Sequence, residues 1–114
     1  MWNTSRFYDS INRMNTLQKG TVRYMVFREE DTWYAVALEF NIVESGDDPR
    51  EVLFNLFEAI QGYVLSARKA HIRAEKILNQ KTDKEYETLW KKVTAPRAIK
   101  SPFQIYSYGK QLIA

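Results

Sequence analysis

Residues 45–51 read Ser-Gly-Asp-Asp-Pro-Arg-Glu, and they mark the change from strands to helix in this chain. Asp48 suits the N-cap of a helix, and Pro49 suits the first helical position because it has no backbone N–H to leave unpaired. Glu51 follows Asp48 by three residues, which is the spacing of a capping box. Gly46 suits the turn before them. The stretch therefore predicts a helix that begins at Pro49.

From Pro49 to about Ala70, apolar residues recur every three or four positions, which is the period of an amphipathic helix. The predicted inner stripe consists of Leu53, Leu56, Phe57, Ile60, Val64 and Ala67. Phe54 and Leu65 fall about 100° to 120° around the helix from Leu53. We therefore expect these two residues to make a second contact, and they are our candidates for self-association.

The residues before the turn are rich in β-branched and aromatic side chains, which are typical of strands. We predict a strand over 22–28, a polar turn over 29–32, a strand over 33–40 and a short strand over 42–44, paired as an antiparallel meander. Side chains alternate between the two faces of a strand. We expect the apolar even-numbered residues of the second strand to lie beneath the long helix. They are Tyr34, Val36, Leu38 and Phe40.

The chain after the long helix carries a second helix signal and a second strand signal. Thr82 and Glu85 have capping-box spacing and precede an apolar pattern, so we expect a shorter helix around 82–94. Residues 103–108 alternate as a final strand. The prediction is an α+β fold in the order β-β-β-α-α-β, with a three-stranded antiparallel meander, a later strand and one long helix packed on the sheet. This domain spans 21–114, and residues 1–20 form an N-terminal arm or tail.

Composition excludes most catalytic chemistry. The 114 residues include no Cys and a single His, so thiol nucleophiles, thiolate metal sites and paired-histidine zinc sites are absent. The acidic residues fall in turns, at a helix cap or away from the inner stripe. They do not come from three elements, as a two-metal nuclease requires. We expect no enzyme activity, no metal and no cofactor.

Charge is unevenly distributed along the chain. Residues 1–67 hold six basic and ten acidic side chains, a net charge of −4, whereas residues 68–114 hold eleven basic and four acidic ones, a net charge of +7. Such a layout suits a nucleic acid or an oppositely charged partner. The candidate residues for binding nucleic acid or an acidic partner are Arg68, Lys69, Arg73, Lys76, Lys91 and Lys92.

Several motifs occur in a characteristic order between about residues 22 and 67. A hydrophobic strand leads into an acidic turn, a strand that starts Trp33-Tyr34, the turn Gly46-Asp47-Asp48-Pro49, and a helix containing Glu58-Ala59-Ile60. In order and spacing this resembles the HicB-like antitoxin family. The resemblance implies a partial RNase H-like β-β-β-α-β fold. It also implies a function, which is to neutralise a small HicA-type mRNA-cleaving toxin by direct binding.

Our expectation is a non-enzymatic HicB-like binding protein, either the antitoxin of a toxin–antitoxin pair or an orphan relative. We expect a homodimer in the cytoplasm that binds a small basic toxin protein. The longest apolar runs are far shorter than the ~20 residues of a membrane span. The alternative is a small RNA-binding or regulatory protein that uses the basic C-terminal third, with RNA or DNA as the partner.

Overall fold

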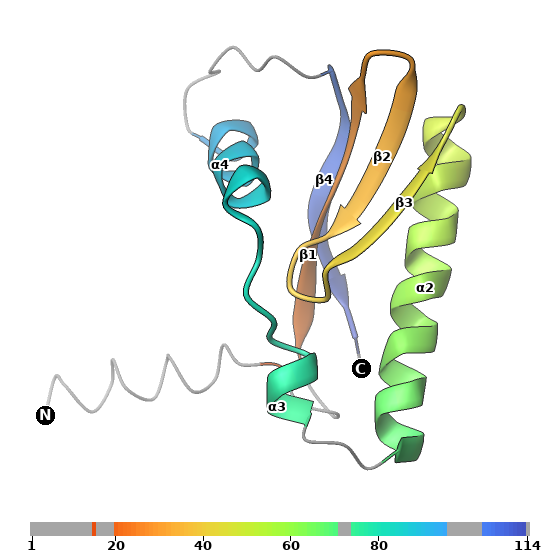
Figure 1. Ribbon diagram of the computed structural model, residues 1–114, viewed down its shortest axis with the longest axis vertical. Helices are drawn as coiled ribbons and strands as arrows, with labels where there is room; N and C mark the ends of the chain where they lie inside the picture. The colour runs from red at the N-terminus through yellow and green to blue at the C-terminus, as the bar shows by residue number, and fades with distance from the viewer. Residues whose placement is uncertain (1–14, 16–19, 71–73, 96–103, 114) are drawn as a thin grey trace, which may run out of the picture.

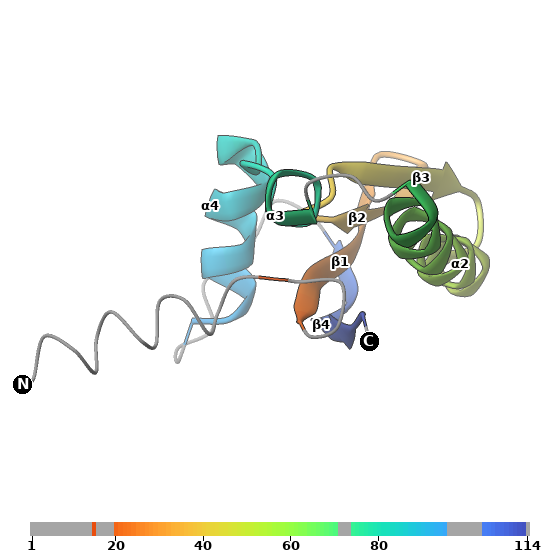
Figure 2. The ribbon, with the colours of Figure 1, turned by 90° about the horizontal axis from the view of Figure 1, so that it is seen from below.

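Four antiparallel strands form one sheet in the order β3-β2-β1-β4, with helices on both of its faces (Figures 1 and 2). A computed structural model describes residue 15 and residues 20–70, 74–95 and 104–113. The strands are β1 (Thr21–Glu29), β2 (Thr32–Ala37), β3 (Ile42–Gly46) and β4 (Gln104–Leu112). The helices are α2 (Pro49–Ala70), the one-turn α3 (Ala74–Ile77) and α4 (Lys84–Val93). The predicted α+β class and the β-β-β-α-α-β order are confirmed.

The meander closes through two short turns, each with one residue in the left-handed backbone region. β1 pairs with β2 from Tyr24↔Ala37 to Glu29↔Thr32, so Glu30 and Asp31 alone make the turn. Glu30 has φ of 56°, and its carbonyl accepts a hydrogen bond of 2.9 Å from Arg28 Nε. Asn41 has φ of 53° just before β3, and asparagine is among the residues that tolerate this conformation best. The predicted strand order of the meander is confirmed.

Helix α2 begins and ends where the sequence predicts. The Asp48 carboxylate accepts a hydrogen bond of 2.9 Å from the Arg50 N–H, as an N-cap side chain does. The helix then runs for 22 residues, about 33 Å. One stripe is buried along its whole length, and it consists of Val52, Leu56, Ile60, Val64 and Ala67. Leu53 and Phe57, expected in this stripe, are only half-buried at its borders.

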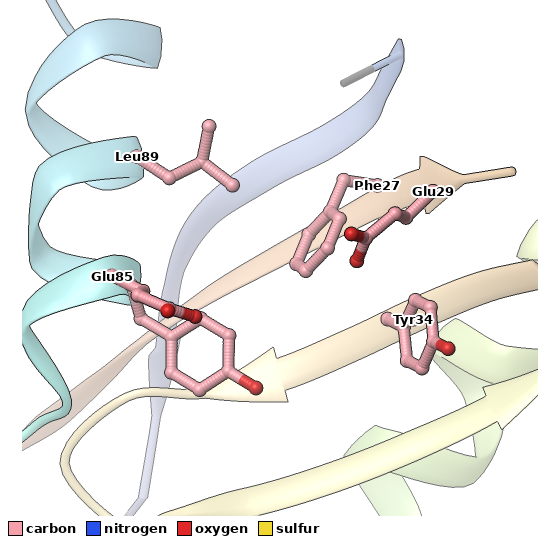
Figure 3. A pocket seen from close by; sticks show the side chains of 6 residues that line it. Phe27, Glu29, Tyr34, Glu85 and Leu89 are labelled. Atoms are coloured by element: carbon pink, nitrogen blue, oxygen red, sulfur yellow. The ribbon is translucent and has the colours of Figure 1, made fainter. Parts of the chain in front are cut away.

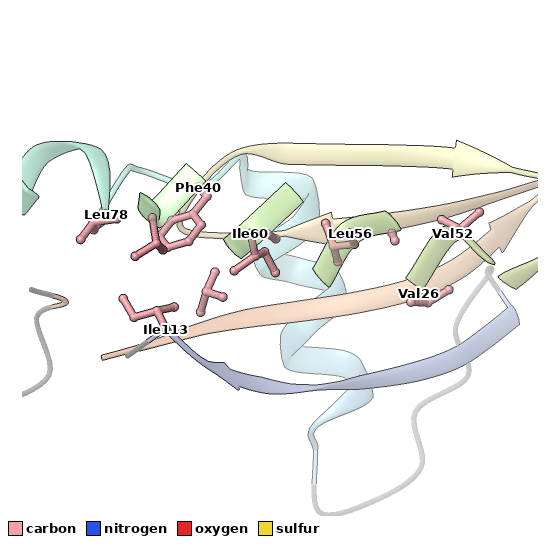
Figure 4. Packing of buried hydrophobic residues seen from close by; sticks show 11 residues of the cluster. Val26, Phe40, Val52, Leu56, Ile60, Leu78 and Ile113 are labelled. Atoms are coloured by element: carbon pink, nitrogen blue, oxygen red, sulfur yellow. The ribbon is translucent and has the colours of Figure 1, made fainter. Parts of the chain in front are cut away.

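The face of the sheet on which α2 packs is opposite to the one we predicted. The core under α2 contains Ala35 and Ala37 of β2 together with Val22 and Val26 of β1 (Figure 4). Of the even-numbered residues expected there, only Phe40 belongs to this core, and it lies beyond the end of β2. The other three, Tyr34, Val36 and Leu38, lie on the other face of the sheet.

That other face carries a second, smaller core, which α4 covers (Figure 2). Its buried members are Met25, Phe27, Val36, Leu38 and Leu89, with Tyr34, Tyr86, Trp90, Val93 and Ile105 packed around them. The shorter helix was therefore expected correctly around 82–94, but its start differs in detail. The Thr82 hydroxyl donates to the Leu38 carbonyl at 3.1 Å, and Asp83 occupies the N-cap without a side-chain capping bond. The capping box predicted at Thr82 was wrong, because Thr82 fastens the chain to the end of β2 instead.

Asn15 is the one described residue of the predicted N-terminal arm apart from Gly20, and it is buried. Its side-chain amide donates to the Leu78 carbonyl at 2.8 Å, and its Oδ1 accepts from the Thr21 N–H at 2.8 Å. Gly20 has φ of 153°, and a Cβ there would collide with the Asn15 side chain. Asn15 therefore ties the start of β1 to the segment after α3. Residues 1–14 and 16–19 lie outside the described part of the chain.

Candidate functional site

Helix α4 is held on the sheet by one arginine of β1. The Arg23 guanidinium donates to Glu39 through Nε, and through Nη1 and Nη2 to Glu87 on α4, with the Nη1–Oε2 distance at 3.2 Å. The Arg23 Cζ also lies 5.5 Å from the centroid of the Trp90 ring, within the range of a cation–π interaction. The Arg23 side chain is 22% exposed, so these contacts are partly shielded from water.

Two opposing effects act on the pKa of Arg23. Burial of the guanidinium lowers its pKa, but hydrogen bonds to Glu87 and Glu39 and the negative charges of these two carboxylates outweigh burial. The net result is that the pKa of Arg23 is raised above its ordinary value. Arg23 therefore remains a cation at every physiological pH, and its ion pairs connect α4 to the sheet at every physiological pH.

One flank of α4 forms a pocket with β1 and β2, which we call the acidic–aromatic pocket (Figure 3). It has a volume of about 220 Å³, and its lining consists of Phe27, Glu29, Tyr34, Glu85, Tyr86 and Leu89. The Phe27 ring stacks on Tyr34 at 5.8 Å between centroids and tilts toward Tyr86 at 6.4 Å. In the view of Figure 3 the Phe27 ring lies between the carboxylates of Glu29 and Glu85.

The electrostatic character of this pocket is negative. Burial raises the pKa of the Tyr86 phenol above its ordinary value, and the negative charges of Asp83, Glu85 and Glu29 raise it further. Neither Glu29 nor Glu85 makes an ion pair with a described residue. A pocket with aromatic walls and two carboxylates that no described cation pairs is chemically suited to a cation.

The other flank of α4 is a basic groove of about 470 Å³, lined by Arg23, Gln80, Lys81, Thr82, Lys84, Glu87, Thr88 and Lys91. The charge of Arg23 is already matched by Glu39 and Glu87. Lys81, Lys84 and Lys91 are exposed, make no ion pair with a described residue, and provide the positive charge of the groove. Helix α4 thus separates an acidic pocket from a basic groove.

The predicted basic residues that the structure describes lie on three different helices. Arg68 and Lys69 lie in the last turn of α2, and Lys76 lies in α3, which is next to that end of α2 in Figure 1. Lys91 and Lys92 lie in the last turn of α4, apart from the others (Figure 1). Arg73 lies outside the described residues. Of the six candidates, only Lys91 lines a pocket described above.

The predicted self-association residues are exposed on the outside of α2. Phe54 is 61% exposed and Leu65 is 52% exposed. They are 11 positions apart, so an ideal helix places them within about 20° of the same face. The sheet adds further exposed apolar area at Val43 of β3 and at Tyr106, Tyr108 and Leu112 of β4.

Four exposed acidic residues lie in two turns at one end of the molecule. β2 and β3 pair at Trp33↔Gly46, so the residues that follow Gly46 lie beside those that precede Trp33. Neighbouring strands are about 4.8 Å apart. This places Asp47 and Asp48 next to the β1–β2 turn with its exposed Glu30 and Asp31. We call this region the acidic end, and Glu29 connects it to the acidic–aromatic pocket.

Sequence reasoning missed the acidic–aromatic pocket, because its two halves are far apart in the chain. One signal was present. Glu85, Tyr86 and Leu89 recur at helical spacing in a segment that was correctly predicted as a helix, so they had to share one side of it. The sequence does not indicate against which strand this side of the helix packs.

No family model matches this chain, and neither a curated protein nor a solved structure is significantly similar to it. Within the described residues, no group of three or more His, Asp or Glu side chains is arranged to hold a metal ion. No helix in the described ranges is long and apolar enough to span a bilayer.

Proposed function

We propose that this chain is a HicB-like binding protein, the antitoxin of a toxin–antitoxin pair, and that it neutralises a small basic HicA-type toxin by direct contact. The protein acts by binding and not by catalysis. The order β1-β2-β3-α2, followed by β4 in the same sheet, is consistent with the β-β-β-α-β unit that the family resemblance implies.

The acidic end is the single observation that carries the choice of a basic protein partner. Four exposed acids, Glu30, Asp31, Asp47 and Asp48, meet there on two adjacent turns, and the Asp31 side chain is 101% exposed. Two arginines flank these turns, Arg28 near the end of β1 and Arg50 at the start of α2, and they only partly offset this charge. A cluster of one sign steers a partner of the other sign and increases the rate of association.

The test is toxin neutralisation in the native host. A tagged chain is purified to ask whether one small basic protein co-purifies, and that protein is then expressed alone and together with the chain. We expect growth arrest by the partner alone and recovery on co-expression. If no partner causes arrest, or if the chain does not relieve it, the proposal is wrong.

A matched pair of variants locates the contact. Asp31→Lys with Asp47→Lys reverses two charges at the acidic end, and Glu58→Lys with Glu51→Lys makes the same change in charge on exposed positions of α2. Recovery of growth is expected to be lost in the first variant and kept in the second. Equal recovery in both would show that the acidic end is not the contact.

The basic groove beside α4 favours a second candidate function, that of a small RNA-binding or regulatory protein. Lys81, Lys84 and Lys91 would neutralise phosphates and release counterions, so affinity for RNA would fall steeply with salt. Lys84→Glu with Lys91→Glu is expected to abolish such binding. Salt-independent binding, or none at low salt, would exclude this function.

A further inference from the structure

We propose that the acidic–aromatic pocket receives the guanidinium of one arginine side chain from the partner protein. The inference rests on the proposed function, because it takes the partner to be basic. It adds the place and the chemistry of one contact.

The size of the pocket fits one side chain. Its volume is about 220 Å³, whereas sites for small-molecule ligands and cofactors usually occupy about 300–1,000 Å³. The pocket is lined by residues of α4, β1 and β2 (Figure 3), and one of them, Glu29, directly precedes Glu30 and Asp31 of the acidic end. A partner attracted to the acidic end is therefore well placed to insert a side chain here.

The walls favour a flat cation over a neutral or an anionic group. The faces of aromatic rings carry negative charge density, which attracts guanidinium and ammonium groups. Phe27 and Tyr34 are stacked with an interplanar angle of 28°, and Tyr86 is tilted against Phe27 at 49°. Guanidinium is planar, stacks on such rings and is less strongly hydrated than the ammonium of lysine, so it enters this pocket at a lower desolvation cost.

The two carboxylates supply the charge that a guanidinium needs. Glu29 lies at the end of β1 and Glu85 lies in the first turn of α4, so the two carboxylates would contact a ligand from different elements. The raised pKa of Tyr86 reflects the same negative field, since Glu85 and Glu29 are among its causes after burial. A guanidinium between the two carboxylates would form charge-assisted hydrogen bonds with both.

The two arginines of β1 are engaged elsewhere. Arg23 is bonded to Glu39 and Glu87 on the opposite flank of α4. Arg28 donates to the Glu30 carbonyl at 2.9 Å and pairs with Asp31 at 3.6 Å. Among the described residues, no cation of the chain lines this pocket.

The experiment titrates the full chain with three capped amino acids and follows the Tyr34, Tyr86 and Leu89 signals by nuclear magnetic resonance. The probes are N-acetyl-arginine amide, its neutral isostere N-acetyl-citrulline amide, and N-acetyl-lysine amide. We expect the capped arginine to cause saturable chemical-shift changes. The capped lysine should bind at least about tenfold more weakly, and the capped citrulline should not bind. Citrulline binding as tightly as arginine would overturn the role of charge, and lysine binding equally would overturn the choice of guanidinium.

Glu29→Gln with Glu85→Gln removes both charges and keeps the shape of the pocket. Its control is Glu44→Gln with Glu58→Gln, which removes two charges outside the pocket. Arginine binding is expected to fall at least about tenfold in the first variant and to be unchanged in the second. An unchanged affinity in the first variant would refute the proposal.

The outcomes separate this proposal from the proposed function. If capped arginine binds as expected but no toxin is neutralised, the pocket is an arginine site and the antitoxin role is wrong. If the chain neutralises a toxin equally well with and without Glu29→Gln and Glu85→Gln, the antitoxin role stands and the pocket is not the place where the partner inserts its arginine.

Discussion

Replacing Arg23 by alanine tests whether α4 is pinned to the sheet as the structure indicates. The substitution removes hydrogen bonds to Glu39 and Glu87 and the contact with the Trp90 ring. It also leaves two carboxylates facing each other with no cation between them. We expect α4 to be loosened and the free energy of unfolding to fall.

The magnitude follows from the exposure of the three side chains. Breaking a fully buried ion pair costs about 3–5 kcal/mol, and an exposed pair contributes about 0–1 kcal/mol. Arg23, Glu39 and Glu87 are 22%, 19% and 34% exposed, so they lie between these limits. Loss of the cation–π contact adds about 0.5–1 kcal/mol. We expect Arg23→Ala to lower the free energy of unfolding by about 2–3 kcal/mol.

Urea unfolding of the intact chain measures this difference, and Arg28→Ala is the matched control in the same strand. Arg28 pairs with Asp31 at 3.6 Å, with side chains 42% and 101% exposed, so its loss should cost less than about 0.5 kcal/mol. If Arg23→Ala costs no more than Arg28→Ala, the guanidinium does not hold α4 and our reasoning about this site fails.

Three further predictions concern the helices. Leu56 is fully buried, so Leu56→Ala should lower the free energy of unfolding by about 3–5 kcal/mol. Phe54 is exposed, so Phe54→Ala should change it by less than about 0.5 kcal/mol. If urea unfolding gives the same loss for both variants, the orientation of α2 is wrong. Because the pKa of Tyr86 is raised in the folded protein, the contribution of Tyr86 to the free energy of unfolding is fully present below the ordinary phenol pKa of about 10 and is lost as the pH rises through the folded pKa. The free energy of unfolding should therefore fall less steeply at alkaline pH in Tyr86→Phe than in the native chain. Light scattering should give a dimer mass for the native chain and a monomer mass for Phe54→Asp with Leu65→Asp; a monomeric native chain would exclude self-association.

The parts of the fold that were predictable are those encoded by neighbouring residues. Asp48 and Pro49 start α2 because a cap and a proline act within one turn, and the spacing from Leu56 to Val64 follows from the helix period alone. The turn at Glu30 is flanked by two strands that are rich in β-branched and aromatic residues, as strands typically are. Each of these signals is complete within a few residues, so tertiary packing had little to add.

The candidate site was not predictable, because its interactions join residues distant in the chain. Arg23 and Glu87 are 64 positions apart, and their pairing depends on how α4 returns to the sheet after α2. The acidic–aromatic pocket depends on the same return, since it joins Glu29 to Glu85. The binding role of the basic candidates stays a prediction, and the structure assigns them to different helices: Lys69 lies in α2 and Lys76 in α3.

Size, and not hydrophobicity alone, explains why α2 packs on the face that we did not choose. Both faces of β2 are apolar, but Ala35 and Ala37 are small, whereas Val36 and Leu38 are large. At the end of β3, a Cβ on Gly46 would lie only 3.0 Å from Val52 of α2, so the first turn of the helix comes very close to the sheet. A long helix gains most contact where small residues let it approach in this way. The larger side chains lie on the opposite face of the sheet, where α4 packs over them. The acidic–aromatic pocket forms along one side of α4, between this helix and strands β1 and β2.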